Sequence, residues 1–227
     1  MTATAFGLAA LALAALAGAG LLSSLYASTA GDIARHSNGR SDSVAAGRLA
    51  VQLAPWRSAP RRYLAQSHSA RGELDAALTE AEAAVRVSPA DGYAWAYLAR
   101  LVTAQLRFDE RAHGFYAMAL RRAPHAAPLH RSIAVDGVLR WRFGDAGLRE
   151  LWRRSMLYSL HHERRAFLSD VVRLGRDPHW CAAQAQALPV GRWCQQAQRM
   201  RRLCSRAGLT DEAAAWCRDY GLLARRR

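Results

Sequence analysis

The residues APRRYLAQSHSARGELDAALTEAEAAVRVSP, from Ala59 to Pro89, contain two segments rich in Ala and Leu on either side of a short polar tripeptide. That tripeptide is centred on Gly72, and a glycine between two apolar segments is typical of a turn. Pro89 ends the second segment because proline cannot continue a helix. The stretch therefore predicts one helix–turn–helix unit. Its apolar positions include Leu64, Ala65, Ala77, Ala81 and Ala84.

The same unit recurs along the chain. Pro55, Pro89 and Pro124 are separated by 34 and 35 residues, and a fixed period of this length indicates stacked helical pairs. The second full unit, Asp91 to Pro124, needs one extra residue between its helices to keep the register. The residues from Val44 to Pro55 match the second half of an earlier unit. Small residues at the repeated positions allow two helices to cross at close range.

This pattern resembles the tetratricopeptide repeat family over residues 44–128. The resemblance implies an all-α solenoid of helical hairpins, whose curved surface holds a peptide or a partner helix. A generic Ala-rich helical bundle is the alternative. The matching repeat-core residues are Leu64, Ala65, Ala77, Ala81, Ala84, Pro89, Trp95, Leu98, Ala99, Tyr116, Ala119 and Pro124.

The N-terminal residues 1–31 contain no charged side chain. Phe6 to Leu22 is apolar over nearly the length of a membrane-spanning helix, and no basic residue precedes it as in a signal peptide. A cleaved signal peptide with Ser28 and Ala30 near the cleavage site is the alternative. We expect a retained transmembrane anchor, a linker over residues 32–43, and a location in the inner membrane with the soluble part in the periplasm.

Beyond the repeats, residues 129–177 predict a diverged helical pair with apolar positions at helical spacing. No stretch alternates with the period of a strand, so the expected fold is entirely helical. His125 and His130 flank Pro128 and are expected on the surface of a loop. His161-His162-Glu163 is expected to be a solvated polar face, because adjacent helical residues point in different directions.

The four cysteines, Cys181, Cys194, Cys204 and Cys217, all lie in residues 178–227, and three directly follow a tryptophan. Cys181 and Cys194 lie at equal distances on either side of one predicted turn, and Cys204 and Cys217 do so around the next. The two members of each pair would therefore face each other across a helical hairpin. This arrangement favours two disulfides, Cys181–Cys194 and Cys204–Cys217. Such bridges are typical of an oxidising compartment such as the periplasm. The alternative is four buried thiols, and the spacing gives zinc little support.

The formal net charge is +14, and all 32 basic residues are arginine. A basic chain can bind an acidic protein, an acidic glycan or lipid surface, or phosphate. Interleaved tryptophans (Trp141, Trp152, Trp193) either stack on nucleotide bases or pack in the core. The arginine pairs considered for partner binding are Arg153 with Arg154, Arg164 with Arg165, and Arg201 with Arg202.

No catalytic motif, phosphate-binding loop or metal-ligand spacing occurs, so no cofactor and no enzymatic activity are expected. The sequence therefore predicts a non-enzymatic scaffold for a protein partner. By the family resemblance, an exported protein of this kind would serve an envelope assembly such as surface polysaccharide synthesis or export. The alternative function is a basic, helical nucleic-acid-binding protein.

Overall fold

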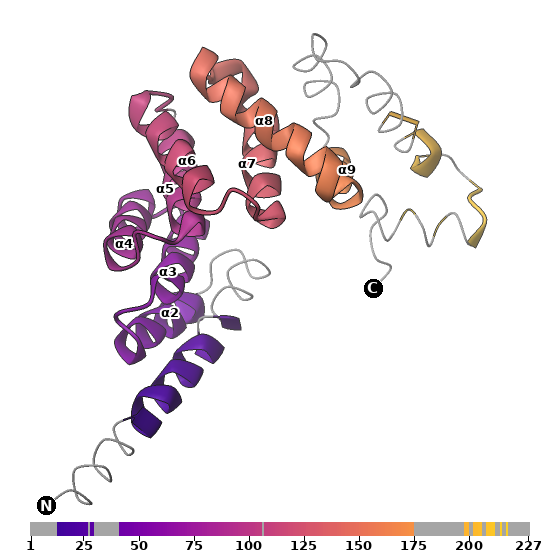
Figure 1. Cartoon of the computed structure of the whole chain (residues 1–227). Coiled ribbons are helices and arrows are strands. Elements are labelled where there is room, and N and C mark those ends of the chain that lie inside the picture. The colour runs from indigo at the N-terminus through magenta and orange to yellow at the C-terminus, as the bar shows by residue number, and fades with distance from the viewer. Residues whose placement is uncertain are drawn as a thin grey trace, which may run out of the picture. The chain divides into compact units, whose positions relative to one another are not determined.

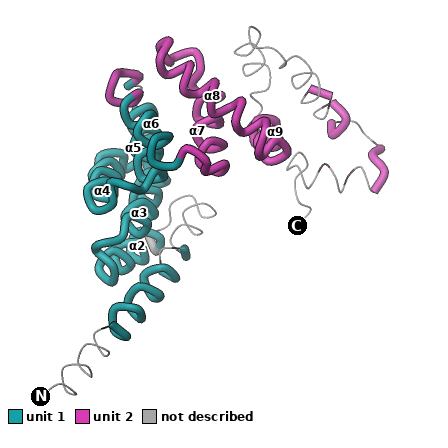
Figure 2. The backbone as a smooth tube through the Cα atoms, viewed as in Figure 1, with its two compact units in different colours: residues 1–107, 114–123 teal, residues 108–113, 124–227 magenta. Residues whose placement is uncertain are grey.

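The computed structural model describes residues 13–26, 28–29, 41–105, 107–174, 198–199, 202–205, 208–211, 214 and 217. These residues form helices and turns, and none of them belongs to a β-strand, so the predicted all-α class is confirmed (Figure 1). The chain forms two compact units. The first comprises residues 1–107 and 114–123, and the second comprises residues 108–113 and 124–227 (Figure 2).

The first unit is built from consecutive helices of similar length, and those over residues 41–104 pack in chain order. α3 contacts α2 before it and α4 after it, and also contacts α5, which packs against α4. Contact with the next helix and the next but one is the packing of stacked helical pairs. The helices are α2 Ser41–Leu53, α3 Ser58–Ala70, α4 Leu74–Val87, α5 Gly92–Ala104 and α6 Glu110–Arg122. α2 begins inside the stretch predicted as a linker.

The turns lie where the sequence predicts them. Gly72 adopts φ +79° in the turn between α3 and α4, a conformation that side chains with a Cβ disfavour. The connection from α5 to α6 is longer, and the Asp109 carboxylate accepts hydrogen bonds from the backbone N–H groups of Arg111 and Ala112 at 3.1 and 3.2 Å. The extra residue that the sequence predicts between the helices of the repeat Asp91 to Pro124 is therefore accommodated in this capped loop.

Small side chains fill the core of the first unit. Ala65, Ala77 and Ala84 are fully buried and pack with the larger Leu98 and Leu101 in one cluster. A Cβ on Gly92 would lie 2.8 Å from the Ala119 carbonyl oxygen. Of the predicted repeat-core residues, Trp95 is half-buried, Pro89 and Pro124 are exposed, and the others are buried. Trp95 Nε1 donates to the Pro89 carbonyl at 2.9 Å, so the proline position also fixes the following helix.

The second unit places an aromatic core among three helices. α7 Ala127–Arg140 leads through a short 3-10 turn, Trp141–Phe143, into α8 Ala146–His162, which is followed by α9 Arg164–Arg173. α9 packs against both α7 and α8. Among the largest fully buried side chains are Trp152, Phe167, Leu129, Ile133, Leu148 and Met156.

The N-terminal segment differs from the prediction. Residues 13–26 are helical, but within the described ranges no helix combines the length and apolarity needed to cross a membrane. The predicted retained span, and with it the placement in the inner membrane and periplasm, is wrong. The helix instead makes polar contacts with the repeats. Buried Ser23 donates to the Ala50 carbonyl at 2.8 Å, and Arg57 donates to Gly20 O and Ser24 Oγ at 3.1 and 2.6 Å.

One of the two predicted disulfides is present. Cys204 and Cys217 are bonded, with their Cα atoms 5.6 Å apart, and both are buried. Gly208 lies in the turn between them with φ +78°. For this pair the structure has the bridge and not the free thiols of the alternative. The other predicted bridge, Cys181–Cys194, lies outside the described residues.

Candidate protein-binding face

Arg62 on α3 lies beside two tyrosine rings. Its guanidinium carbon is 5.5 Å from the ring centroid of Tyr63 and 5.4 Å from that of Tyr93 on α5. At these distances a guanidinium interacts favourably with the face of an aromatic ring. The contacts therefore restrain a long, otherwise flexible side chain at the place where α3 meets α5. We call Arg62, Tyr63 and Tyr93 the arginine–tyrosine site.

The start of α5 is fixed next to this site by a capping interaction. The Asp91 carboxylate accepts the Tyr93 backbone N–H at 2.9 Å, which caps the first turn of α5. The same carboxylate accepts the Ser58 hydroxyl at 2.7 Å. Ser58 and Arg62 are four residues apart on α3 and so lie on the same helical face. The Asp91 bridge therefore holds Tyr93 close to Arg62.

Arg62 differs from Arg57 and Arg61 in having neither a hydrogen-bond partner nor an ion-pair partner among the described residues. Arg61 forms an ion pair with Glu80 at 3.1 Å, and Arg57 is bonded to Ser24 and to a backbone carbonyl. No described residue forms a hydrogen bond or ion pair with the Arg62 guanidinium, and its Nε is buried without a hydrogen-bond acceptor. A guanidinium presents several N–H donors that suit a carboxylate. Arg62 is thus a restrained cation that lacks a counter-ion within the described chain.

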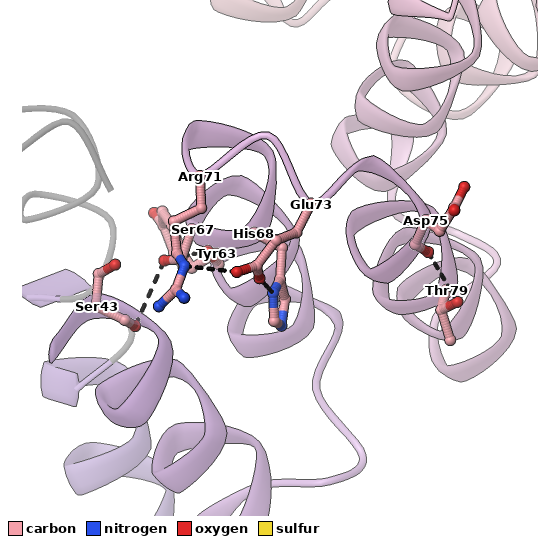
Figure 3. A network of polar contacts seen from close by, with 8 residues as sticks. All are labelled: Ser43, Tyr63, Ser67, His68, Arg71, Glu73, Asp75 and Thr79. Atoms are coloured by element: carbon pink, nitrogen blue, oxygen red, sulfur yellow. Dashed lines mark hydrogen bonds and ion pairs between the residues drawn. The ribbon is translucent and has the colours of Figure 1, made fainter. Parts of the chain in front are cut away.

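A polar network at the far end of α3 stabilises the turn into α4 (Figure 3). The Glu73 carboxylate pairs with His68 Nδ1 at 2.6 Å and with Arg71 Nε at 2.7 Å. The hydrogen bond from His68, supported by Arg71, lowers the pKa of Glu73 against the opposing effect of burial. Ser67 Oγ donates to the Tyr63 carbonyl at 3.1 Å and to the Ser43 carbonyl of α2 at 3.4 Å. The network therefore secures α3 at the end opposite Ser58.

The polar network places one histidine against one carboxylate. His68 Nδ1 and Glu73 Oε2 lie 2.6 Å apart in a turn, and no hydroxyl or thiol adjoins this pair among the described contacts. Among the described residues no group of three His, Cys, Asp or Glu side chains is arranged to hold a metal ion. The arrangement does place one arginine beside two tyrosine rings, Arg62 with Tyr63 and Tyr93.

The arginine pairs predicted for partner binding differ in their surroundings. Glu150 Oε2 accepts Arg153 Nε, and Glu150 Oε1 accepts Arg154 Nε, both at 2.8 Å. These hydrogen bonds lower the pKa of Glu150 to about 2, so the carboxylate stays charged and partly neutralises both arginines. Arg164 and Arg165 are exposed at the start of α9, Arg202 is exposed, and Arg201 lies outside the described residues.

The structure also describes several of the tryptophans and histidines considered in the sequence analysis. Trp152 is fully buried, so it cannot stack on a nucleotide base, and Trp141 packs against it with ring centroids 6.5 Å apart. Trp193 lies outside the described residues.

His130 was expected on a loop but is buried within α7, because Pro128 stands in the first turn of that helix. His161 and His162 are exposed, as expected for a polar face.

Sequence reasoning missed Arg62 and Tyr93 as site residues. Arg62 has the same local signal as Arg61, and only the folded chain shows which of the two has a carboxylate beside it.

A scan of known protein families and a search of characterised proteins both give no match to this chain.

Proposed function

We propose that this chain is a non-enzymatic scaffold that binds a protein partner on the surface of its tetratricopeptide-like helical pairs. The period of 34 and 35 residues and the packing of α3 against α2, α4 and α5 support that architecture. The envelope and polysaccharide setting is not part of the proposal, since it depended on the N-terminal span.

The observation that carries the proposal is the arginine–tyrosine site. Arg62 is held against Tyr63 and Tyr93 and has no carboxylate partner among the described residues. An acidic partner segment could supply that carboxylate, while the tyrosine rings would contact its apolar neighbours. The net charge of +14 would attract such a segment at long range. The partner we propose is therefore a protein with an exposed acidic and apolar segment.

The same charge could attract nucleic acid, which is the alternative function. That function would use bases stacked on exposed aromatic side chains beside the arginine pairs. Trp152 is buried and Glu150 already binds Arg153 and Arg154, so these predicted contributors are poorly placed for it. The protein partner is accordingly favoured.

The test measures fluorescence anisotropy of short labelled peptides that alternate Glu with Leu, compared with peptides carrying Gln in place of Glu. We expect the full chain to bind the acidic peptides more tightly. Arg62→Ala should weaken binding by about tenfold, because a charged hydrogen bond contributes about 1.5–3 kcal/mol and about 1.4 kcal/mol is a factor of ten.

Arg48→Ala is the matched control, since Arg48 is exposed on α2 and its loss removes the same charge. It should weaken binding far less than Arg62→Ala. Equal effects of the two substitutions would show general charge attraction and overturn the assignment of the site. Preferential binding of a single-stranded oligonucleotide that displaces the peptide would favour the alternative function.

A further inference from the structure

His130 is a buried histidine of the second unit. Its side chain is buried, and its Nε2 hydrogen-bonds the Pro124 carbonyl at 2.9 Å. Its other ring nitrogen, Nδ1, is buried and has no hydrogen-bond partner. The neutral imidazole suits this environment, because Nε2–H donates to the carbonyl and Nδ1 carries no hydrogen. A second proton would place an N–H group where no acceptor lies.

The His130 ring is one member of an aromatic stack across α7 and α8. It lies parallel to the Tyr158 ring, with centroids 3.9 Å apart, and Tyr158 in turn lies 4.2 Å from the ring of His162. The Tyr158 hydroxyl donates to the His125 carbonyl at 3.2 Å. The stack therefore ties the segment before α7 to the last turns of α8. We call His130, Tyr158 and His162 the histidine–tyrosine stack.

The charged groups around the stack do not favour an added proton. His125 precedes α7, and His161 lies in edge contact with His162 on α8, so the nearest titratable groups bring no negative charge to His130. The carboxylates near α9 are Glu163 and Asp170. Arg131 of α7 pairs with them at 3.1 and 3.5 Å, so both already have a cationic partner.

We propose that the histidine–tyrosine stack is an acid-sensitive lock, which holds the Pro124–His130 segment against α8 at neutral pH and releases it when His130 gains a proton. Protonation of His130 would bury an N–H donor without an acceptor. A cation on the Tyr158 ring is itself favourable, but that gain persists only while the two rings stay in contact. Opening the stack returns the His130 imidazolium to water.

The direction of the pKa shift of His130 agrees with release of the stack in acid. Burial lowers the pKa of His130 below its ordinary value, and His162 and His125 lower it further, while the hydrogen bond to Pro124 opposes them. A histidine whose pKa is lowered in the closed state binds protons more readily once it is released. The closed state is therefore fully favoured above the ordinary histidine pKa of about 6.5 and loses stability as the pH falls below it.

The test is hydrogen–deuterium exchange of the full chain at about pH 7.5 and about pH 5.5, on either side of the ordinary histidine pKa of about 6.5. Rates are corrected for the intrinsic effect of pH on exchange. We expect a several-fold loss of protection at the lower pH in α8 and in the first turn of α7, with no comparable loss in α3 and α4. Unchanged protection in α7 and α8 of the wild-type chain would overturn the proposal.

His130→Phe keeps an aromatic ring on Tyr158 and removes the titrating group, so this variant should show little acid-induced loss of protection. His113→Gln is the control, because it removes a half-buried histidine of the same unit outside the stack, and it should respond as the wild type does. An equal acid response in His130→Phe would also overturn the proposal. Should His130→Phe fail to fold, a nuclear magnetic resonance titration of the wild-type histidines decides: a His130 that protonates while the exchange of α8 is unchanged would exclude the lock.

Discussion

Gly137 of α7 faces Trp152 of α8 so closely that a Cβ on Gly137 would lie 2.5 Å from the Trp152 Cβ. A Cβ on Gly144 would meet the far edge of the same indole ring. Trp152 is fully buried, so its ring occupies space that two glycines leave free. The close approach of α7 and α8 therefore depends on one large residue and two residues without side chains.

Gly137→Ala should lower the free energy of unfolding by about 1–3 kcal/mol, because the added methyl group overpacks the contact with Trp152. Gly114→Ala is the matched control, since Gly114 is also helical and a Cβ there would meet nothing within 4 Å. The control should gain about 0.5–1 kcal/mol from reduced backbone entropy. Urea unfolding of the two variants measures both changes, and a shift of the same sign in both would contradict the packing described.

Leu98→Ala should cost about 2–5 kcal/mol, because a buried side chain is lost and a cavity remains in the first core. Leu98 is 3% exposed and belongs to the cluster that joins α4 and α5. Arg107→Ala, in the exposed connection to α6, should change stability by less than about 0.5 kcal/mol. Thermal unfolding compares the two, and equal losses would mean that the repeat register does not define the core.

The helical pairs could be predicted because their cause is local and periodic. Leu64, Ala77 and Ala84 recur at positions that a helix presents on one side, and Gly72 marks the turn between them. Each of these residues carries its own signal. The proline period then sets where the next pair begins, which placed α5 and α6 correctly.

The candidate sites depend on contacts between helices and could not be predicted in the same way. Arg62 differs from Arg61 in having no carboxylate such as Glu80 beside it, and His130 differs from a surface histidine in being buried against the Tyr158 ring. The prediction of a membrane span in the N-terminal segment was wrong for a related reason. Its uncharged composition suited a membrane span, whereas its buried Ser23 is bonded to Ala50, which composition does not reveal.

Glu150 should titrate well below an ordinary glutamate. Hydrogen bonds from Arg153 and then Arg154 lower its pKa from 4.5 to about 2. Since the pKa is lower in the folded state, the interaction stabilises the fold above pH 4.5 and is lost as the pH falls towards about 2. The groups are largely solvated, so Glu150→Gln should cost under about 1 kcal/mol at neutral pH.

Two measurements check the behaviour of Glu150. A carboxyl titration followed by nuclear magnetic resonance should place the midpoint of Glu150 well below the ordinary glutamate value of 4.5. The stability difference between wild type and Glu150→Gln should shrink in high salt, because exposed ion pairs are screened. A Glu150 midpoint near 4.5 would show that its arginine contacts are not maintained in solution.

The Cys204–Cys217 bridge should make the segment between these two cysteines a covalently closed element of the native protein. The two cysteines are 13 residues apart and both are buried around the turn at Gly208. Closing a loop of this length restricts the unfolded chain and should contribute about 2–4 kcal/mol. Cys204→Ser and Cys217→Ser should therefore each lower the midpoint of thermal unfolding, and the double variant should lose little more than either single one, since both remove the same bond.

Peptide mapping of the native protein without reducing agent tests the pairing directly. A linked pair of peptides carrying Cys204 and Cys217 is expected, and the same experiment reports on the pair Cys181–Cys194 predicted from the sequence. Additive losses in the two serine variants would mean that each cysteine acts through packing and not through a common bond. Recovery of both Cys204 and Cys217 as alkylated thiols from the unreduced protein would contradict the bridge, because a bonded pair offers no thiol to the reagent.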